Sequence, residues 1–199
     1  MASPTPAVSH LLYLHGFRSS PKSAKARMVA AGVAARHPEV TWWCPQLPPS
    51  PKAAMRLVMD GVAAWPRDRM GVIGSSLGGF YATYVAQVCG CRAVLLNPAV
   101  DPARDLAKYI GEQATWHDPG ERFFFEPRYI DELRELEAGP LRVPGNFFAV
   151  IAKGDEVLDW REMVARYPGA RIELIEGSDH AISDFDDHID AILGFLGLP

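Results

Sequence analysis

The sequence predicts an α/β fold with a mostly parallel sheet of about six strands and helices on both of its faces. The first observation is that short apolar or alternating runs, bounded by Gly, Pro or polar clusters, recur along the chain as strands do. The second is that longer runs between them carry apolar residues at spacings of three and four, as amphipathic helices do. Parallel strands need crossover connections, and helices in those crossovers cover the sheet.

Six segments fit strands and five fit helices. The strands are expected at residues 11–14, 41–43, 71–73, 93–96, 146–152 and 171–175, and the helices at 22–36, 53–65, 77–89, 160–167 and 185–196. A length of 199 residues is enough for one domain that buries roughly 70% of its unfolded surface. We therefore expect residues 1–199 to form a single domain.

Residues 101–140 interrupt the alternation of strands and helices. Two helices are expected there, at about 102–110 and 127–138, with the stretch WHDPGERFFFEP between them and no strand. Long excursions inside compact domains are typically lids or binding loops, so this segment is interpreted as a small helical lid insertion. The alternative is an ordinary crossover with extra turns.

Composition argues against several classes of function. The formal net charge is −4, with basic and acidic residues mixed along the chain, so no basic surface for nucleic acid is expected. Cys44, Cys89 and Cys91 lack the spacing of a redox or zinc motif and are interpreted as reduced packing groups, with no metal site. The N-terminus lacks the features of a signal peptide, and no apolar run approaches the ~20 residues of a membrane helix. A cytoplasmic protein without membrane insertion is therefore expected.

Residues 74–78 read Gly-Ser-Ser-Leu-Gly, which matches the G-x-S-x-G motif between a strand and a helix. In that motif the central serine, here Ser76 and not Ser75, is the nucleophile on a strained turn. The glycines remove Cβ atoms that would collide with the neighbouring strand and helix. The N–H of Leu77 is then a candidate oxyanion donor at the start of the helix. The alternatives are a glycine-rich turn without chemistry and a phosphate loop, and the latter lacks its Gly-Lys-Ser/Thr ending.

Two later residues complete a triad in the chain order Ser, Asp, His. Asp155 directly follows the strand at 146–152, and His180 follows the last strand in the same way. Acidic and basic groups just past the carboxyl ends of parallel strands lie at the edge where α/β sheets keep their sites. Asp155 competes with Glu156 and Asp159 in the same loop, and it could instead be a turn residue or helix cap.

The loop after the first strand, His15-Gly16-Phe17, is expected to supply the second oxyanion donor through the N–H of Phe17. His15 is interpreted as a hydrogen-bonding support for this loop rather than as the base. Loops near the site also carry apolar residues that are expected to line a substrate pocket, namely Val100, Trp116, Phe123, Phe124, Phe125, Val157 and Ile182. The alternative for the three phenylalanines is that they pin the insertion to the core.

These blocks together resemble the α/β-hydrolase superfamily and, more narrowly, the small bacterial YqiA-type esterases. The resemblance runs from about residue 11 to residue 196 and rests on LLYLHGFRSSPKSAKA, PQLPPSP, GSSLGG, LLNPAV, KGDEVLDWR and GSDHA in that order. It implies a three-layer α/β-hydrolase fold, with Ser76, Asp155 and His180 as nucleophile, acid and base. It also implies esterase activity on small or acyl-chain carboxylic esters or acyl thioesters, and no cofactor. The match loosens across residues 115–125.

Other uses of the same scaffold remain as alternatives. A Ser-His-Asp triad also serves C–C bond hydrolysis, peptide cleavage and perhydrolysis. The hydrolase fold also hosts non-catalytic ligand-binding proteins, although these usually lack a triad member. A small-molecule ester or acyl thioester is the partner that the sequence favours.

Overall fold

A six-stranded parallel sheet runs through the computed structural model, which describes residues 7–118 and 120–199. Its strands, in chain order, are β1 (His10–Leu14), β2 (Thr41–Trp43), β3 (Met70–Ser75), β4 (Arg92–Leu96), β7 (Phe147–Ala152) and β8 (Arg171–Ile175). In space they lie in the order β2-β1-β3-β4-β7-β8. All six expected strands are present, and the α/β fold class is confirmed.

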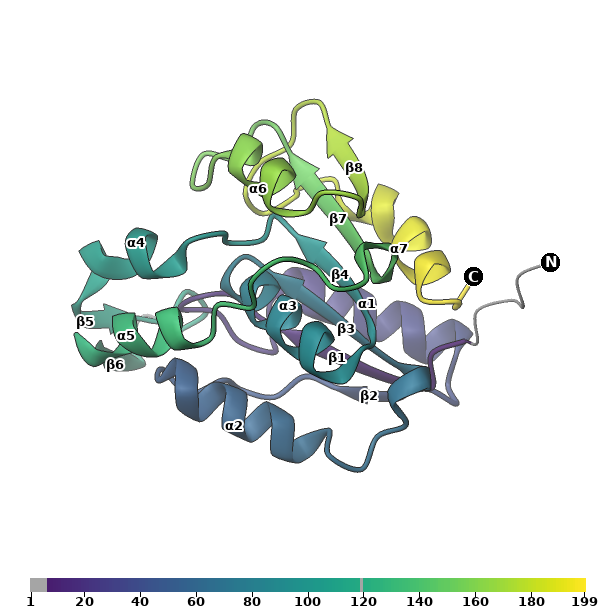
Figure 1. Ribbon diagram of the computed structural model, residues 1–199, viewed down its shortest axis with the longest axis horizontal. Helices are drawn as coiled ribbons and strands as arrows, with labels where there is room; N and C mark the ends of the chain where they lie inside the picture. The colour runs from purple at the N-terminus through teal and green to yellow at the C-terminus, as the bar shows by residue number, and fades with distance from the viewer. Residues whose placement is uncertain (1–6, 119) are drawn as a thin grey trace.

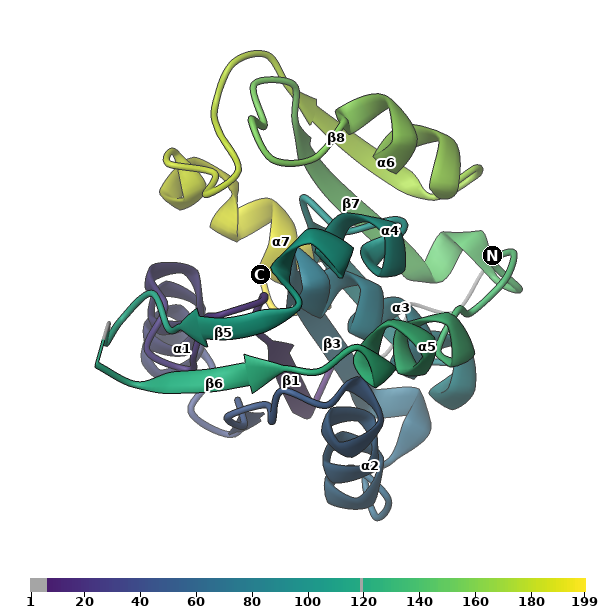
Figure 2. The same ribbon diagram turned by 90° about the vertical axis from the view of Figure 1, so that its left-hand side faces the viewer.

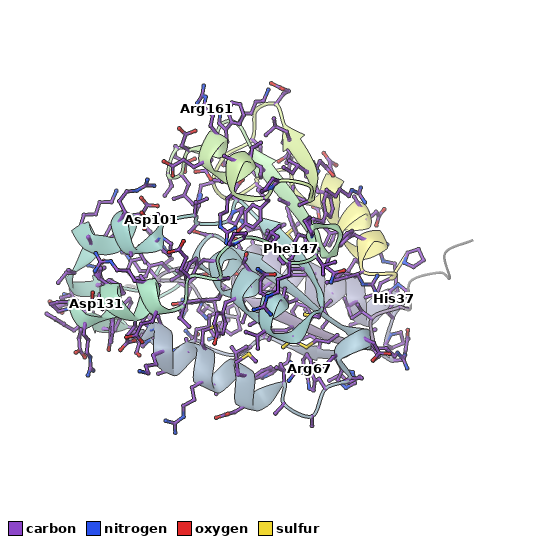
Figure 3. All side chains as sticks on the ribbon, in the orientation of Figure 1. His37, Arg67, Asp101, Asp131, Phe147 and Arg161 are labelled. Atoms are coloured by element: carbon purple, nitrogen blue, oxygen red, sulfur yellow. The ribbon has the colours of Figure 1, made fainter. Side chains whose placement is uncertain are left out.

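Helices cover both faces of this sheet because its strands alternate side chains between two cores (Figure 1). Leu12, Val72 and Leu95 point toward one core, which is shared with α2 (Pro51–Gly61), α3 (Leu77–Cys89) and α6 (Trp160–Arg166). The opposite core is shared with α1 (Ala24–Arg36) and α7 (Ile189–Phe195), the latter preceded by the 3₁₀ turn η4 (Phe185–His188). Two further 3₁₀ turns, η1 (Arg67–Arg69) and η3 (Pro144–Asn146), precede β3 and β7. In Figure 3 the buried Phe147 lies inside the molecule, whereas Asp131 and Arg161 lie at its outer edge.

The segment between β4 and β7 contains both helices and strands. It holds α4 (Pro102–Leu106), the 3₁₀ turn η2 (Ala107–Tyr109), β5 (Gly111–Ala114), β6 (Arg122–Phe125) and α5 (Arg128–Glu135). The expectation that this segment has no strand is wrong, since β5 and β6 pair antiparallel, with Gln113 opposite Phe123. Figure 2 shows this hairpin crossing in front of β1 and β3. The insertion therefore lies over the edge of the sheet where the functional loops emerge.

Two expectations concern the whole chain. That residues 1–199 form one domain stays a prediction, and residues 1–6 and 119 lie outside the described residues. Within residues 7–118 and 120–199, every helix is too short or too polar to span a bilayer.

Candidate active site

Ser76 lies at the sharp turn between β3 and α3. Its backbone has φ 55° and ψ −120°, a left-handed conformation that is uncommon for a residue with a side chain. Hydrogen bonds hold the turn in this state: the N–H of Ser76 donates to the carbonyl oxygen of Leu96 at 2.9 Å, and its carbonyl accepts from the N–H of Ala99 at 3.0 Å. The strained turn is thus supported by the end of the neighbouring strand β4.

Close backbone packing explains the glycines around this serine. A Cβ atom on Gly74 would lie 2.1 Å from the carbonyl oxygen of Gly78, and one on Gly78 would lie 1.9 Å from that of Leu14. A Cβ on Gly79 would lie 2.7 Å from the Cβ of Pro98. Each distance is shorter than a van der Waals contact. The helix α3 can therefore approach β3 and β1 only because these positions lack side chains.

Ser76, His180 and Asp155 form one continuous chain of hydrogen bonds. The Oγ of Ser76 lies 3.1 Å from Nε2 of His180, and Nδ1 of the same ring lies 2.7 Å from Oδ2 of Asp155. Because a carboxylate only accepts hydrogen bonds, Nδ1 is the donor and Nε2 is left to accept from the serine hydroxyl. The Asp155 side chain is fully buried, whereas 23% of the His180 side chain is exposed. The imidazole is thus held at Nδ1 by a buried carboxylate, while part of its ring is accessible from the cleft.

The neighbouring carboxylates make different contacts. The other oxygen of Asp155, Oδ1, accepts from the N–H groups of Val157 and Leu158 at 2.8 Å each, which orients the carboxylate. Glu156 accepts from the backbone N–H of His180 at 3.0 Å and does not reach the ring. Asp159 accepts from the N–H of Arg161 at 2.9 Å and caps α6. Among the three acids, Asp155 is therefore the one bonded to the imidazole.

The backbone N–H groups of Phe17 and Leu77 belong to the two loops that meet beside Ser76. Leu77 is the first residue of α3, so its N–H has no partner within the helix. Among the hydrogen bonds of residues 7–118 and 120–199, neither N–H group has an acceptor. Both residues line the cleft in front of Ser76 and His180. Two uncommitted donors beside a serine are what an oxyanion hole requires.

His15 supports the Phe17 loop from inside the protein. Its Nδ1 lies 3.0 Å from the carbonyl oxygen of Gly16, and its Nε2 lies 3.1 Å from the backbone nitrogen of Leu47. The backbone N–H must donate, so Nε2 is unprotonated and Nδ1 donates to the carbonyl. Burial lowers the pKa of this imidazole, which favours the neutral ring. The ring therefore ties the loop to residue 47, as the sequence analysis expected.

Asn97 is a site residue that sequence reasoning did not single out. Its side chain is fully buried at the end of β4, where its Oδ1 accepts from the N–H of Ala152 at 2.8 Å. Its Nδ2 donates to the carbonyl oxygens of Asp179 and His180 at 3.0 and 3.2 Å. Asn97 thus ties the loop of His180 to strand β7, which leads to Asp155. The available signal was a polar residue directly after the buried run at 93–96.

Lys25 holds the same loop from α1. Its Nζ donates to the carbonyl oxygen of Ala181 at 2.6 Å. Burial lowers the pKa of this ammonium to about 8, although Asp179 and Asp155 partly oppose the shift. Positive charge near the acid and base loop is therefore weaker at alkaline pH.

Two clefts meet at Ser76 and His180. The first, here called the insertion cleft, has a volume of about 270 Å³ and lies between the insertion and the loop of the acid; its walls include Ala99, Pro102, Leu106, Tyr109, Trp116, Val157 and Leu158. The second, here called the helix cleft, has a volume of about 430 Å³ and lies beside the start of α1; its walls include Ser19, Ser23, Lys25, Ser75, Glu156 and Ala181. Both clefts are lined mainly by apolar surface, and the walls of the helix cleft add the polar and charged side chains of Ser23, Lys25 and Glu156.

The structure places the seven expected pocket residues in several environments. Trp116 and Val157 line both clefts and are 69% and 56% exposed, so they form the rim. Phe123 lines a separate cavity described below. Phe125 is buried beneath the insertion, and Phe124 is exposed, because alternate side chains of a strand point to opposite faces.

Ile182 and Val100 were also expected at the pocket, and neither lines a cleft. Ile182 lies in a turn with φ 52° that directs its side chain into the core beside α1 and α7, where it is only 1% exposed. Val100 packs against the core on the α3 side of the sheet. Like Phe124 and Phe125, these two residues line neither of the two clefts nor the separate cavity, so these four pocket predictions are wrong.

No group of three or more His, Cys, Asp or Glu residues within 7–118 and 120–199 is arranged to hold a metal ion. The three cysteines are free thiols, and burial raises the pKa of Cys44 and of Cys91 to about 12. These thiols are therefore protonated packing groups rather than nucleophiles.

The parallel sheet, the serine turn after β3 and the loops of Asp155 and His180 after β7 and β8 define a protein of the α/β-hydrolase fold. Residues 10–197 match the family described as "Uncharacterised protein family (UPF0227)". The chain belongs to this family.

Curated relatives carry the same family name, and solved structures share the fold. A UPF0227 protein of Serratia proteamaculans (strain 568) is 26% identical over 131 residues, which cover 64% of this chain and 65% of the relative. The match thus spans less than two thirds of that relative's length. A crystallised protein from Agrobacterium vitis S4 superposes with a TM-score of 0.75 at 17% identity and covers 96% of this chain and 91% of the other. A monoacylglycerol lipase from Paleococcus ferrophilus superposes with a TM-score of 0.70 at 14% sequence identity, and the match covers 96% of this chain and 95% of the lipase. At this identity the structural likeness shows the fold.

Proposed function

We propose that the protein is a serine hydrolase that cleaves carboxylic esters, acyl thioesters included, through an acyl-enzyme intermediate. The observation that carries the proposal is the hydrogen-bonded chain Ser76–His180–Asp155, with 3.1 and 2.7 Å between its members. A serine on a strained strand-to-helix turn, next to two uncommitted N–H groups, is the further support. The lipase among the structural relatives agrees with this class of reaction.

In the first step, Ser76 Oγ attacks the carbonyl carbon of the ester while its proton moves to Nε2 of His180. The resulting oxyanion accepts hydrogen bonds from the N–H groups of Phe17 and Leu77. Asp155 stabilises the imidazolium through its bond to Nδ1. When the tetrahedral intermediate collapses, the bond to the leaving group breaks and His180 returns the proton to that group.

In the second step, water replaces the leaving group as the partner of His180. The imidazole takes a proton from the water as its oxygen attacks the acyl carbon, and the same oxyanion donors stabilise the second intermediate. The acid is released, and the proton returns to Ser76 Oγ. No further reactant is needed.

The two clefts divide the substrate between them. The apolar walls of the insertion cleft, such as Leu106, Tyr109 and Leu158, suit the acyl chain. The helix cleft, which adds Ser23, Lys25 and Glu156 to its apolar walls, suits the leaving group, which departs next to His180. We therefore expect esters with an apolar acyl part and a polar alcohol or thiol part.

The test is the intact mass of the protein after treatment with a fluorophosphonate, which reports an activated serine without knowledge of the substrate. We expect one adduct on the wild-type protein, located at Ser76, and none on Ser76→Ala. Ser75→Ala, which alters the adjacent serine, is the matched control and should still form the adduct. Folded wild-type protein that forms no adduct would contradict the proposal.

A further inference from the structure

We propose that the aromatic ring of Phe17 is a wall that separates the insertion cleft from a second cavity and thereby limits the length of the acyl chain. This inference rests on the proposed function and adds a specificity-determining role for the side chain of Phe17. That role is distinct from the role of its backbone N–H.

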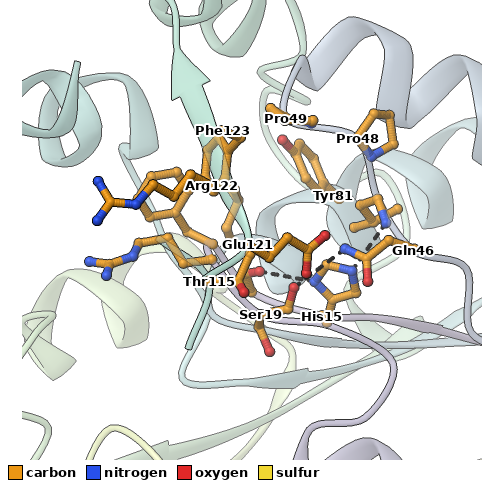
Figure 4. A pocket seen from close by; sticks show the side chains of 15 residues that line it. His15, Ser19, Gln46, Pro48, Pro49, Tyr81, Thr115, Glu121, Arg122 and Phe123 are labelled. Carbon is orange, nitrogen blue, oxygen red and sulfur yellow. Dashed lines mark hydrogen bonds between the residues drawn. The ribbon is translucent and has the colours of Figure 1, made fainter. Parts of the chain in front are cut away.

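The second cavity, here called the hairpin cavity, lies between the hairpin β5–β6 and the loop at residues 46–49, with a volume of about 390 Å³. In Figure 4, Phe123 of the hairpin lies near Tyr81 and Pro49, His15 and Ser19 lie below, and Arg122 extends away from them. Leu47, Pro48, Pro49 and Phe123 give this cavity apolar walls, and Gln46, Glu121 and Arg122 are the polar and charged groups around it. An apolar chain would therefore find a suitable interior there.

The hairpin cavity and the insertion cleft are neighbours that share three residues, Phe17, Arg18 and Leu77. Ser76 and His180 line the insertion cleft and do not line the hairpin cavity. An acyl chain that lies in the insertion cleft must therefore pass one of the three shared residues to enter the hairpin cavity.

Two of the shared residues are held by other parts of the structure. Nε of Arg18 donates to the carbonyl oxygen of Ala114 at 2.6 Å, and its guanidinium lies 4.1 Å from the centre of the Trp116 ring. Leu77 starts α3 and is only 8% exposed. Phe17 is the large apolar side chain among the three, and it lines both spaces and the helix cleft.

Aromatic packing fixes the Phe17 ring across the gap. Its centre lies 5.6 Å from that of Tyr109, 5.9 Å from that of Phe123 and 5.2 Å from that of Phe125. The last two contacts are edge-to-face, a favourable arrangement for aromatic rings. With the ring in this position, an acyl chain in the insertion cleft has about 270 Å³, below the range of roughly 300–1,000 Å³ that is usual for ligand pockets. The wild-type site should therefore favour short acyl chains.

The experiment compares kcat/KM for p-nitrophenyl dodecanoate and p-nitrophenyl butyrate in wild type, Phe17→Ala and Phe17→Leu. Each methylene group that becomes buried is worth about fourfold in binding, so three buried methylenes give roughly 60-fold. We expect wild type to favour butyrate. Phe17→Ala should raise the ratio of dodecanoate to butyrate by at least about 30-fold, and Phe17→Leu should raise it less.

Two additional variants test whether the acyl chain of the substrate enters the hairpin cavity. In the double variant Phe17→Ala, Gln46→Trp, a large ring at the exposed position 46 fills the hairpin cavity and should reverse most of the gain. Phe124→Ala removes a ring of the same size from the exposed face of β6 and should leave the ratio as in wild type.

The outcomes separate the two proposals. Wild-type protein that neither hydrolyses an ester nor reacts with the fluorophosphonate contradicts the proposed function. The role of Phe17 as a wall is overturned if an active Phe17→Ala variant has the same ratio of dodecanoate to butyrate hydrolysis as wild type. It is also overturned if adding Gln46→Trp does not reduce the gain in that ratio, or if wild type favours dodecanoate. Folded Phe17→Ala and Phe17→Leu that hydrolyse neither ester also overturn it, because the ring would then serve the reaction itself.

Discussion

The loops after β3, β7 and β8 and the insertion at residues 101–140 meet at the same cleft, but different interactions hold them in place. The loops are held by buried contacts: α3 packs at Gly78 against the backbone of Leu14, and the buried side chain of Asn97 bonds to the backbone of Ala152 and of the His180 loop. The insertion is held by side chains, chiefly the aromatic contacts of Phe17 and the bond from Arg18 to Ala114. Substitutions should therefore alter the substrate walls far more easily than the geometry of the triad.

The largest effect should come from the acid of the triad. In Asp155→Asn the amide can donate to Nδ1 of His180, which favours the wrong tautomer for accepting the Ser76 proton. We expect kcat to fall by about 10⁴, as in a serine protease with the same change. Steady-state kinetics with a short ester measure this loss. Glu156→Gln, the neighbouring acid that contacts only the backbone of His180, should cost less than about tenfold. Equal losses of kcat in Asp155→Asn and Glu156→Gln would contradict the assignment of Asp155 as the acid of the triad.

The next effect concerns the stability of the serine turn. Gly78→Ala places a Cβ 1.9 Å from the carbonyl oxygen of Leu14, so α3 must move away from β1. We expect the free energy of unfolding to fall by about 3 kcal/mol, measured by urea denaturation. Gly145→Ala is the matched control because no heavy atom outside the neighbouring residues lies within 4 Å of its added Cβ. A similar small change in both variants would show that the close approach is not needed.

The smallest effect should come from the insertion. Arg18→Met removes the hydrogen bond to Ala114 and the cation that stacks on Trp116. We expect substrate binding to weaken by about 1 kcal/mol because the insertion is less well positioned. KM for an ester should therefore rise roughly fivefold, with little change in the thermal midpoint of unfolding. Arg122→Met on the same hairpin breaks an exposed ion pair with Glu112 and should change KM less. If Arg18→Met instead lowered the thermal midpoint as much as Gly78→Ala, the contacts of the insertion would matter as much for stability as those of the serine turn.

Much of the sheet and the three members of the triad were predictable from the sequence. Strands such as 146–152 are continuous apolar runs, and Ser76, Asp155 and His180 follow strands in a fixed chain order. Those signals are local. The structure brings the three side chains into one hydrogen-bonded chain, while their catalytic roles stay with the proposed function.

The errors arose where tertiary contacts decide the outcome. The β5 segment Gly-Glu-Gln-Ala has almost no apolar pattern, so its pairing with Arg122–Phe125 was not visible. The positive φ of Ile182, which turns its side chain into the core, has no sequence signal. Asn97 received no role because its partners, Ala152 and His180, are more than fifty residues away in sequence.

The contacts of Asn97 determine how the molecule opens. Its backbone N–H donates to the carbonyl oxygen of Val150, and its side chain accepts the N–H of Ala152. Both amide protons therefore lie inside one bonded unit formed by the ends of β4 and β7 and the loop of His180. Exchange of these protons with solvent deuterium should require global unfolding, whereas the N–H of Thr115, bonded to Glu121 across the hairpin, should exchange by local opening. We therefore expect the hairpin to open many times in the lifetime of one folded molecule while Ser76, His180 and Asp155 stay bonded to one another.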